Sequence, residues 1–253
     1  MTTNNNLKIL LAGESWMTHS LHIKGFSSYD TGSYAEGLEP LRDALIEAGA
    51  DFTYYRNHEV TSRFPFSTEE LEQYDVIILS DVPADTFLLS DDTFIKGERT
   101  PNRLQNISHF VHKGGGLLMV GGYMSFSGYQ GKANYHFSPL AEVLPVKMFG
   151  FDDRIEAPQG LVPQVEHGDH PILSGIPINW PHFLGYNKLM PANNSVTLMT
   201  CQNDPFLIVT EIDKGRTAAF ASDCSPHWAP NEFINWPYYK QFWNQLVRWL
   251  SKV

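Results

Sequence analysis

One stretch of the sequence decides the fold: Gly114-Gly115-Gly116-Leu117-Leu118-Met119-Val120-Gly121-Gly122-Tyr123-Met124-Ser125. A glycine run, which breaks helices, leads into four apolar residues that stop at two further glycines. A buried parallel strand reaches the carboxyl edge of an α/β sheet in this way, and ligands bind at that edge. In nucleophile elbows such glycines let the backbone turn sharply and raise one side chain above the sheet. Here the raised side chain is predicted to be Tyr123, where a Cys or Ser nucleophile is expected.

The composition is that of a globular protein. The chain has 253 residues, of which 42% are hydrophobic, and this is enough for a sizeable core. No apolar run approaches the ~20 residues of a membrane span, so no membrane partner is predicted. The formal net charge of −10 argues against nucleic-acid binding, because that binding needs a basic surface.

The ends of the chain and its cysteines favour a cytoplasmic location. Residues 1–6 are polar and lack a basic segment, so we predict a disordered N-terminus without a signal peptide. The two cysteines are Cys201 and Cys224. Two free thiols in a reducing cytoplasm account for them better than one disulfide does.

Strands and helices alternate in the first half of the chain. Strands are predicted at residues 7–12, 52–55, 76–79 and 117–120, and helices at 36–48, 67–70 and 102–112. Between the first strand and the first helix, residues 14–34 are polar and rich in His, Ser and Gly. They are predicted to form a long loop, and long loops at sheet edges are often functional.

The second half is richer in β structure. Strands are predicted at 145–149, 160–165, 196–200, 206–210 and 217–221, with a hairpin turn at 213–216 and a last helix at 238–250. The buried stripe of that helix is predicted to be Tyr239, Phe242, Trp243, Leu246, Val247 and Leu250. Without repeats or linkers, residues 7–253 are expected to form a single α/β domain. Its fold is a doubly wound, mostly parallel sheet with an antiparallel extension.

Five segments together resemble a known family: residues 13–16 (GESW), 22–25 (HIKG), 97–103 (GERTPNR), 114–128 and 222–228 (SDCSPHW). With them the chain resembles the uncharacterised putative glutamine amidotransferase family. That family belongs to the class I glutamine amidotransferase-like superfamily, which also includes trehalose-utilisation-type proteins. The resemblance spans residues 7–250 and implies a flavodoxin-like fold of the class I amidotransferase type.

The residues depart from the superfamily's glutaminase pattern. Class I amidotransferases carry Gly-x-Cys-x-Gly at the elbow and a His and a Glu after a late strand. In this chain the Cys position is Tyr123 and the last Gly is Ser125, and no His-x-Glu stands near Asp223. Glutamine hydrolysis needs a thiolate that the His activates. Ordinary glutaminase activity is therefore not expected.

The cluster at residues 222–228 follows a predicted strand and should lie at the same sheet edge as Tyr123. Cys224, with Asp223 beside it and His227 three residues on, would form a relocated nucleophile and base. In the alternative interpretation Cys224 is a small buried hydrophobe, Asp223 caps a turn and His227 bonds a loop carbonyl. The neighbouring aromatic residues, Trp228 first among them, would either stack on a sugar or pack the C-terminal segment.

Other polar residues suggest binding roles. Lys24, Arg99 and Arg103 would suit a carboxylate or phosphate, or else form salt bridges and subunit contacts. His19 and His22, with Glu14 and His227, have the side chains of a metal site, but their spacing matches no metal signature and no metal is predicted. Backbone N–H groups at Ser125, Ser127 and Gly128 would suit an oxyanion.

Together these features predict a site for a small polar metabolite, such as a sugar or an amide, at the carboxyl edge of the sheet. The lining residues are predicted to be Glu14, Ser15, Tyr123, Ser125, Asp223 and His227, with His22, Lys24, Arg99, Arg103 and Trp228 as further contacts. Tyr123 would donate a hydrogen bond or, with a lowered pKa, act as a general acid or base. Hydrolysis or isomerisation is the expected chemistry, and no cofactor is expected.

Two alternatives remain open from the sequence. The first is a non-catalytic binding module or an oligomeric assembly module, in which the glycine and aromatic segments serve packing and a homo-oligomer contact. The second is a hydrolase that depends on Cys224.

Overall fold

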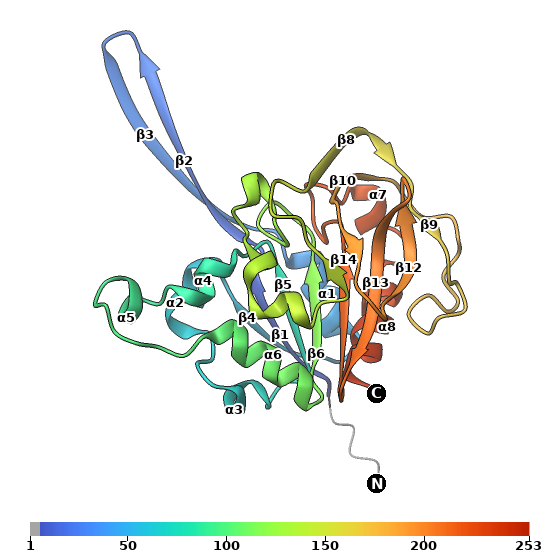
Figure 1. Cartoon of the computed structure of the whole chain (residues 1–253). Helices are drawn as coiled ribbons and strands as arrows, with labels where there is room; N and C mark the ends of the chain where they lie inside the picture. The colour runs from blue at the N-terminus through green and yellow to red at the C-terminus, as the bar shows by residue number, and fades with distance from the viewer. Residues whose placement is uncertain (1–5, 253) are drawn as a thin grey trace.

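The computed structural model describes residues 6–252, so the predicted disordered N-terminus lies almost wholly outside the described residues. An eight-stranded sheet forms the centre, in the order β4-β1-β5-β6-β14-β13-β12-β9 (Figure 1). The first five strands of that order run parallel: β4 (Asp51–Tyr55), β1 (Lys8–Gly13), β5 (Val76–Ser80), β6 (Gly116–Val120) and β14 (Gly215–Phe220). The remaining three, β13 (Asp204–Ile212), β12 (Val196–Cys201) and β9 (Gln164–Val165), are antiparallel. The predicted α/β fold with an antiparallel extension is confirmed.

The central strands are buried along almost their whole length. Every residue of β5 and β6 is buried, as is every residue of β1 after Lys8. Continuous apolar runs are typical of parallel strands that carry helices on both faces, and this is why they stand out in the sequence.

Helices cover both faces of the sheet (Figure 1). The helices α1 (Glu39–Glu47) and α8 (Tyr239–Ser251) pack against each other, and α8 also contacts β5, β6 and β14. The six residues predicted for the buried stripe of α8 are all buried. On the other face lies α6 (Arg103–Lys113), whose first turn is capped because Oδ1 of Asn102 accepts the N–H groups of Leu104 and Gln105.

The remaining helices are short. They are α2 (Asn57–Arg63), α3 (Thr68–Leu71), α4 (Ala84–Leu88), α5 (Asp91–Phe94), α7 (Asn231–Ile234) and the 3₁₀ turns η1 (Tyr129–Gly131), η2 (Tyr135–Phe137) and η3 (Pro139–Glu142). The predicted capping box at α3 is confirmed, with Ser67 and Glu70 each bonding the other's backbone N–H. Among residues 6–252 no helix is long and apolar enough to cross a membrane.

The predicted loop at residues 14–34 is wrong. It is instead a two-stranded antiparallel hairpin, β2 (Ser15–Lys24) and β3 (Ser27–Glu36), that projects from the body of the protein (Figure 1). We call residues 15–36 the hairpin arm. Alternation of apolar and polar residues identifies a strand only when one of its faces is buried, and both faces of the arm beyond its base are exposed.

Two small sheets complete the fold. In the first, β8 (Arg154–Leu161) pairs with β10 (Phe183–Asn187), and in the second β7 (Val146–Lys147) pairs with β11 (Met190–Pro191). The strand predicted at 145–149 is thus only two residues long, and the one predicted at 160–165 is divided between β8 and β9. The hairpin turn predicted between β13 and β14 is confirmed, with Asp213 at φ 48°.

Candidate functional site

Four neighbouring parallel strands end in polar residues at one edge of the sheet. Glu14 follows β1, Asp81 follows β5, Asp223 lies just beyond β14, and Tyr123 lies just beyond β6. These side chains share the lining of one cavity of about 360 Å³ with Trp16, Ser225, Pro226 and His227. The cavity thus lies at the carboxyl edge, where open α/β sheets bind ligands.

Two of these carboxylates sit on unusual backbone. Glu14 has φ 49° and Asp81 has φ 47°, so the backbone of both lies in the left-handed region, which residues other than glycine rarely adopt. This conformation costs about 1 kcal/mol or more and persists only where the surrounding structure enforces it. Tyr123 does not share it, so the turn after β6 is not a strained nucleophile elbow.

Glu14 is almost fully buried, at 2% exposure. Its Oε2 accepts a hydrogen bond from Oγ of Ser80 at 2.5 Å, and its Oε1 accepts one from Oγ of Ser225 at 2.7 Å. Burial raises the pKa of Glu14 well above its usual value, and the negative charges of Asp223 and Asp81 raise it further. Gly37 leaves room for this arrangement, because a Cβ there would lie 2.7 Å from Oε1 of Glu14.

Asp81 is held by the turn after β6. Its Oδ1 accepts the N–H of Met124 at 2.6 Å, and its own N–H donates to Oγ of Ser125 at 3.0 Å. Burial and then the charge of Asp223 raise the pKa of Asp81 to about 6. Ser125, predicted to bind substrate, is buried and positions Asp81 instead.

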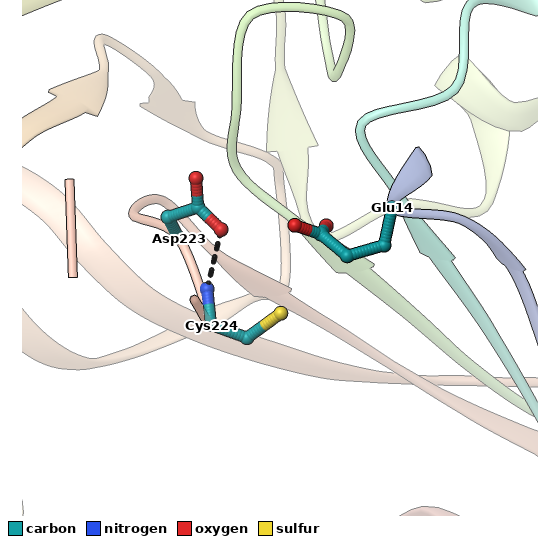
Figure 2. A group of neighbouring side chains, drawn as sticks. All are labelled: Glu14, Asp223 and Cys224. Carbon is teal, nitrogen blue, oxygen red and sulfur yellow. Dashed lines mark hydrogen bonds between the residues drawn. The ribbon is translucent and has the colours of Figure 1, made fainter. Parts of the chain in front are cut away.

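The two carboxylate oxygens of Asp223 have different partners: Oδ1 accepts backbone N–H groups, and Oδ2 contacts His227 in the cavity lining. Oδ1 accepts the N–H groups of Cys224 at 2.7 Å (Figure 2) and Ser225 at 3.2 Å, so the predicted turn cap is present. Oδ2 lies 3.4 Å from Nδ1 of His227. Partial burial lowers the pKa of His227, but the contact with Asp223 and the charges of Asp223, Glu156 and Asp81 outweigh it, so the pKa is raised.

Cys224 has the environment of an inert thiol. Its side chain is fully buried, and its Sγ lies 3.8 Å from Oγ of Ser80. Burial raises the pKa of the thiol well above its usual value, and the carboxylates of Glu14 and Asp223 add to this effect. Reactive cysteines need the opposite, namely exposure and a positive neighbour that stabilises the thiolate. The proposed Cys224 nucleophile is therefore corrected to a buried structural thiol.

Tyr123 is tied to a residue from outside the parallel sheet. Its hydroxyl donates to Oε1 of Glu156 on β8 at 2.8 Å, and Nε1 of the buried Trp228 donates to Oε2 of the same carboxylate at 3.0 Å. The ring of Tyr123 meets that of His227 edge-on, with centroids 4.4 Å apart. Burial and Glu156 raise the pKa of Tyr123, so the lowered pKa considered for it is wrong and the hydroxyl is a hydrogen-bond donor.

The structure does not bring the predicted cationic residues together. Arg103 is buried, and its guanidinium donates to the backbone carbonyls of Phe87, Val60 and Thr86 at 2.7, 2.6 and 3.0 Å. Arg99 is exposed between α5 and α6. Lys24 ends β2, about 30 Å from the base of the arm at ~3.3 Å per residue. A phosphate or carboxylate site built from these three residues is not formed.

Two more predicted contacts have structural partners. His22 lies on the exposed arm, where it stacks on Tyr29 and contacts Oγ1 of Thr31 at 3.0 Å. Ser15 is buried at the base of the arm, where its Oγ accepts the N–H of Asn57 at 2.9 Å. His22 therefore lies away from the cavity, and Ser15 anchors the arm to α2.

The predicted oxyanion-binding N–H groups already have an acceptor. The N–H groups of Ser127 and Gly128 donate to the two carboxylate oxygens of Asp153 at 3.0 and 2.9 Å. Asn187 donates to the same carboxylate at 2.8 Å. This segment therefore holds the loop after β6 in place rather than binding an anion.

The sequence analysis did not predict that Trp16, Ser225 and Pro226 line the cavity, and it missed two acidic residues of the site. Asp81 directly follows a correctly predicted strand, as Glu14 does, so attention to the residue after every buried strand would have found it. Glu156 lies on β8, which has no clear alternating pattern, and its contact with Tyr123 joins residues 33 positions apart. No local signal identifies it.

The possible metal ligands form a compact group. Glu14, Asp223 and Cys224 each place one ligand atom within 4.8 Å of the others (Figure 2). Both oxygens of Glu14 already accept hydroxyl hydrogen bonds, from Ser80 and Ser225. His19 and His22, candidate ligands from the sequence, lie on the arm. The donor set does not favour a metal.

Comparison with known proteins settles the family. The model of the family described as putative glutamine amidotransferase matches residues 8–252. The chain belongs to this family. No curated protein matches this amidotransferase-family member.

Two solved structures share much of its sequence. The cytoplasmic proteins STM3548 and STM1381 from Salmonella typhimurium are each 43% identical to it, with TM-scores of 0.94 and 0.93. Each alignment covers 96% of this chain and 99% of the Salmonella chain. A putative ThuA-like protein from Parabacteroides merdae has a TM-score of 0.57 at 11% identity, over 98% of this chain and 90% of its own, and shows the fold alone. The predicted relation to trehalose-utilisation-type proteins is confirmed at the level of the fold.

Proposed function

We propose that this amidotransferase-family protein binds a small polar metabolite in the cavity at the carboxyl edge of the sheet and acts on it without hydrolysing glutamine. The observation that carries the proposal is the convergence of Glu14, Asp81 and Asp223 with His227 on one cavity of about 360 Å³. Small-molecule sites are concave and combine apolar walls with a few convergent polar groups. Trp16 and Pro226 supply apolar wall here.

The protonation states of the lining support proton-transfer chemistry. The pKa of Asp81 is raised to about 6, that of Glu14 is raised well above its usual value, and that of His227 is raised as well. General acids and bases work best when their pKa lies near the working pH. Hydrolysis or isomerisation of the bound metabolite, with His227 as the acid and an aspartate as the base, fits this set.

Glutaminase chemistry is not supported by the same residues. A class I glutaminase needs a thiolate beside a base, and the residue after Gly122 is Tyr123. The remaining cysteine near the cavity, Cys224, is buried with a raised pKa. The proposed location is the cytoplasm, which the names of the two Salmonella relatives support.

A thermal-shift screen tests the proposal. The library would hold sugars, amino sugars, sugar acids, amides, amino acids and phosphates, each tested on the wild type, Tyr123→Phe and Tyr74→Phe. A ligand that binds the native state alone raises the Tm by mass action. We expect a shift that is reduced in Tyr123→Phe and kept in Tyr74→Phe, because Tyr74 lies beside Asp75 and Gly115 at the opposite edge of the sheet. Equal shifts in both variants would place the ligand elsewhere.

The hairpin arm favours a second function, assembly with a second copy of the chain. Met17, Leu21 and Ile23 project from one face of β2 and are 71%, 61% and 71% exposed, and Phe26 at the tip is fully exposed. Clustered exposed apolar side chains mark interaction surfaces.

Light scattering after gel filtration tests this second function. The wild type is expected to be an oligomer, and the triple variant Met17→Ser, Leu21→Ser, Ile23→Ser is expected to be a monomer with unchanged circular dichroism. A monomeric wild type at high concentration would rule the assembly role out.

A further inference from the structure

We propose that the ligand of the cavity is a protonated amine that also carries hydroxyl groups and has no carboxylate or phosphate. This inference rests on the proposed function and names the chemical class of its metabolite. It follows from the charges, the aromatic side chains and the unused hydrogen-bonding capacity of the described residues.

The charge of the lining is strongly one-sided. Three of the eight lining residues are carboxylic acids, and the single basic residue among them is His227. No Lys or Arg lines the cavity, and carboxylate and phosphate groups are recognised in proteins mainly by such residues. A glutamine-like amino acid would place its own carboxylate against Glu14, Asp81 and Asp223.

A guanidinium packs on the Tyr123 ring that lines the cavity, and it is already paired with carboxylates. Arg154 lies over the ring of Tyr123, with its Cζ 4.4 Å from the ring centroid. Its Nε donates to Asp152 at 2.9 Å, and its Nη1 donates to Glu156 at 3.4 Å. It therefore offers no free positive charge for an anionic ligand.

The carboxylates are short of positive partners. Burial and the repulsion of neighbouring carboxylates raise the pKa of both Glu14 and Asp81, which means that the protein's own residues compensate their ionised forms poorly. Asp223 is 3% exposed, and within residues 6–252 its Oδ2 contacts only His227, at 3.4 Å. An ammonium group placed among these oxygens would stabilise the ionised forms and displace their protons.

Two aromatic side chains fit the same ligand. Trp16, near the base of the arm, and Tyr123, in the turn after β6, both line the cavity. Aromatic faces attract ammonium groups, and this attraction increases when the site excludes water. The hydroxyls of Tyr123 and Ser225 can exchange hydrogen bonds with ligand hydroxyls. The combination of acids, aromatic rings and hydroxyls fits an amino sugar or an amino alcohol.

Isothermal titration calorimetry with a matched set of probes tests the inference. Glucamine, sorbitol and gluconate have similar chains and differ at one end, which is an amine, a hydroxyl or a carboxylate. At near-neutral pH glucamine is expected to bind at least about tenfold more tightly than sorbitol, and gluconate is expected not to bind. Glucamine binding is also expected to release protons, seen as a heat that changes with the ionisation enthalpy of the buffer.

A matched variant assigns the effect to the cavity. Asp223→Asn keeps an oxygen for the N–H groups of Cys224 and Ser225 but removes the charge. We expect this variant to bind glucamine about tenfold or more weakly than the wild type does, and to bind sorbitol with unchanged affinity. If Asp223→Asn binds neither ligand and its circular dichroism spectrum is altered, the variant is misfolded. The titrations are then made with Asp81→Asn, for which the same result is expected.

The possible failures are distinguishable. If sorbitol binds as tightly as glucamine, or gluconate binds more tightly, the amine inference is overturned while the proposed metabolite site stands. If Mg²⁺ or Zn²⁺ added to chelator-treated protein stabilises it and excludes glucamine, the acids form a metal site and the inference fails. If glucamine does not bind in the millimolar range, the inference also fails, and the wider thermal-shift library then decides the proposed function.

Discussion

Nδ1 of His227 lies 3.4 Å from Oδ2 of Asp223, and this pair joins the wall of the cavity to its buried floor. Asp223 is 3% exposed, whereas the side chain of His227 is 39% exposed. The buried carboxylate thus holds an imidazole that a ligand can reach. The same carboxylate caps its own turn through Oδ1, so its position is set by the backbone after β14.

The first prediction concerns the titration of His227. Its pKa is raised although partial burial opposes this, because Asp223 favours the imidazolium form. Asp223→Asn should therefore lower the pKa of His227, which NMR of the imidazole protons can measure. His58, which lies on α2 outside the cavity, serves as the control in the same spectra. An unchanged His227 titration would show that Asp223 does not control this imidazole.

The raised pKa of His227 also determines how the contact between Asp223 and His227 changes the free energy of unfolding with pH. A histidine whose pKa is higher in the folded state contributes stability below its unfolded pKa of ~6.5, and the contribution is lost as the pH rises through the folded value. The stabilising effect of Asp223 on His227 should thus be present at mildly acidic pH and absent at alkaline pH.

The second prediction is that Asp81→Asn stabilises the protein. The pKa of Asp81 is about 6 in the folded state, against 3.8 for an ordinary aspartate. The folded state therefore binds more protons than the unfolded state between these values, and stability falls as the pH rises from about 4 to about 6. At pH 7.5 the amide should raise the free energy of unfolding by up to about 3 kcal/mol, and the gain should shrink towards pH 4.

Urea unfolding at a series of pH values measures this effect. Asparagine keeps an oxygen for the N–H of Met124, so the turn after β6 should persist. Ser67→Ala, which removes the cap of α3, provides a change in stability that does not depend on the titration of Asp81. A gain in stability that is equal at all pH values would mean that the charge of Asp81 does not destabilise the folded protein. A stabilising change at a site residue would fit a site that gives up stability for function.

The buried elements were predictable because their signals are local. Strands β1, β5 and β6 are continuous apolar runs, and the predicted stripe of α8 is its observed buried face. The meeting of Glu14, Tyr123 and Asp223 at one edge also follows, because parallel strands all end at the same edge. These inferences need no knowledge of distant contacts.

The remaining features depend on contacts that no local pattern records. The arm has no buried face beyond its base, and polar and apolar residues alternate strictly only over the short run 20–24, so the polar remainder favours a loop. From the sequence Arg103 is a candidate for binding an anion, but in the structure its guanidinium donates to the carbonyls of Val60 and Phe87. The raised pKa of Tyr123 depends on Glu156, which a separate small sheet brings into place.

The third prediction concerns the thiols. In the native protein Cys224 and Cys201 are both buried, and burial raises the pKa of Cys201 to about 11. Alkylation by iodoacetamide at neutral pH should be slow for both, with a rate set by opening of the fold, and fast for both in urea. Peptide mapping by mass spectrometry separates the two sites. Fast, stoichiometric labelling of Cys224 alone would restore the cysteine hydrolase hypothesis.

The last prediction concerns the hairpin arm. Residues 19–32 would be replaced by Asn-Gly, so that Thr18 and Ser33, which face each other in the native register, flank a two-residue turn. The shortened arm keeps the bond of Ser15 to Asn57, the ion pair of Glu36 with Arg56, and the place of Trp16 in the cavity.

Because these base contacts remain, the free energy of unfolding should change by less than about 1 kcal/mol, and any cavity ligand should bind as before. A long two-stranded ribbon without further cover adds little stability of its own. Assembly, if the arm provides it, should be lost in the same variant, which light scattering would report. A large fall in Tm of a monomeric variant would instead show that the distal arm packs on its own body, and a loss of ligand binding with unchanged Tm would make the distal arm part of the binding site.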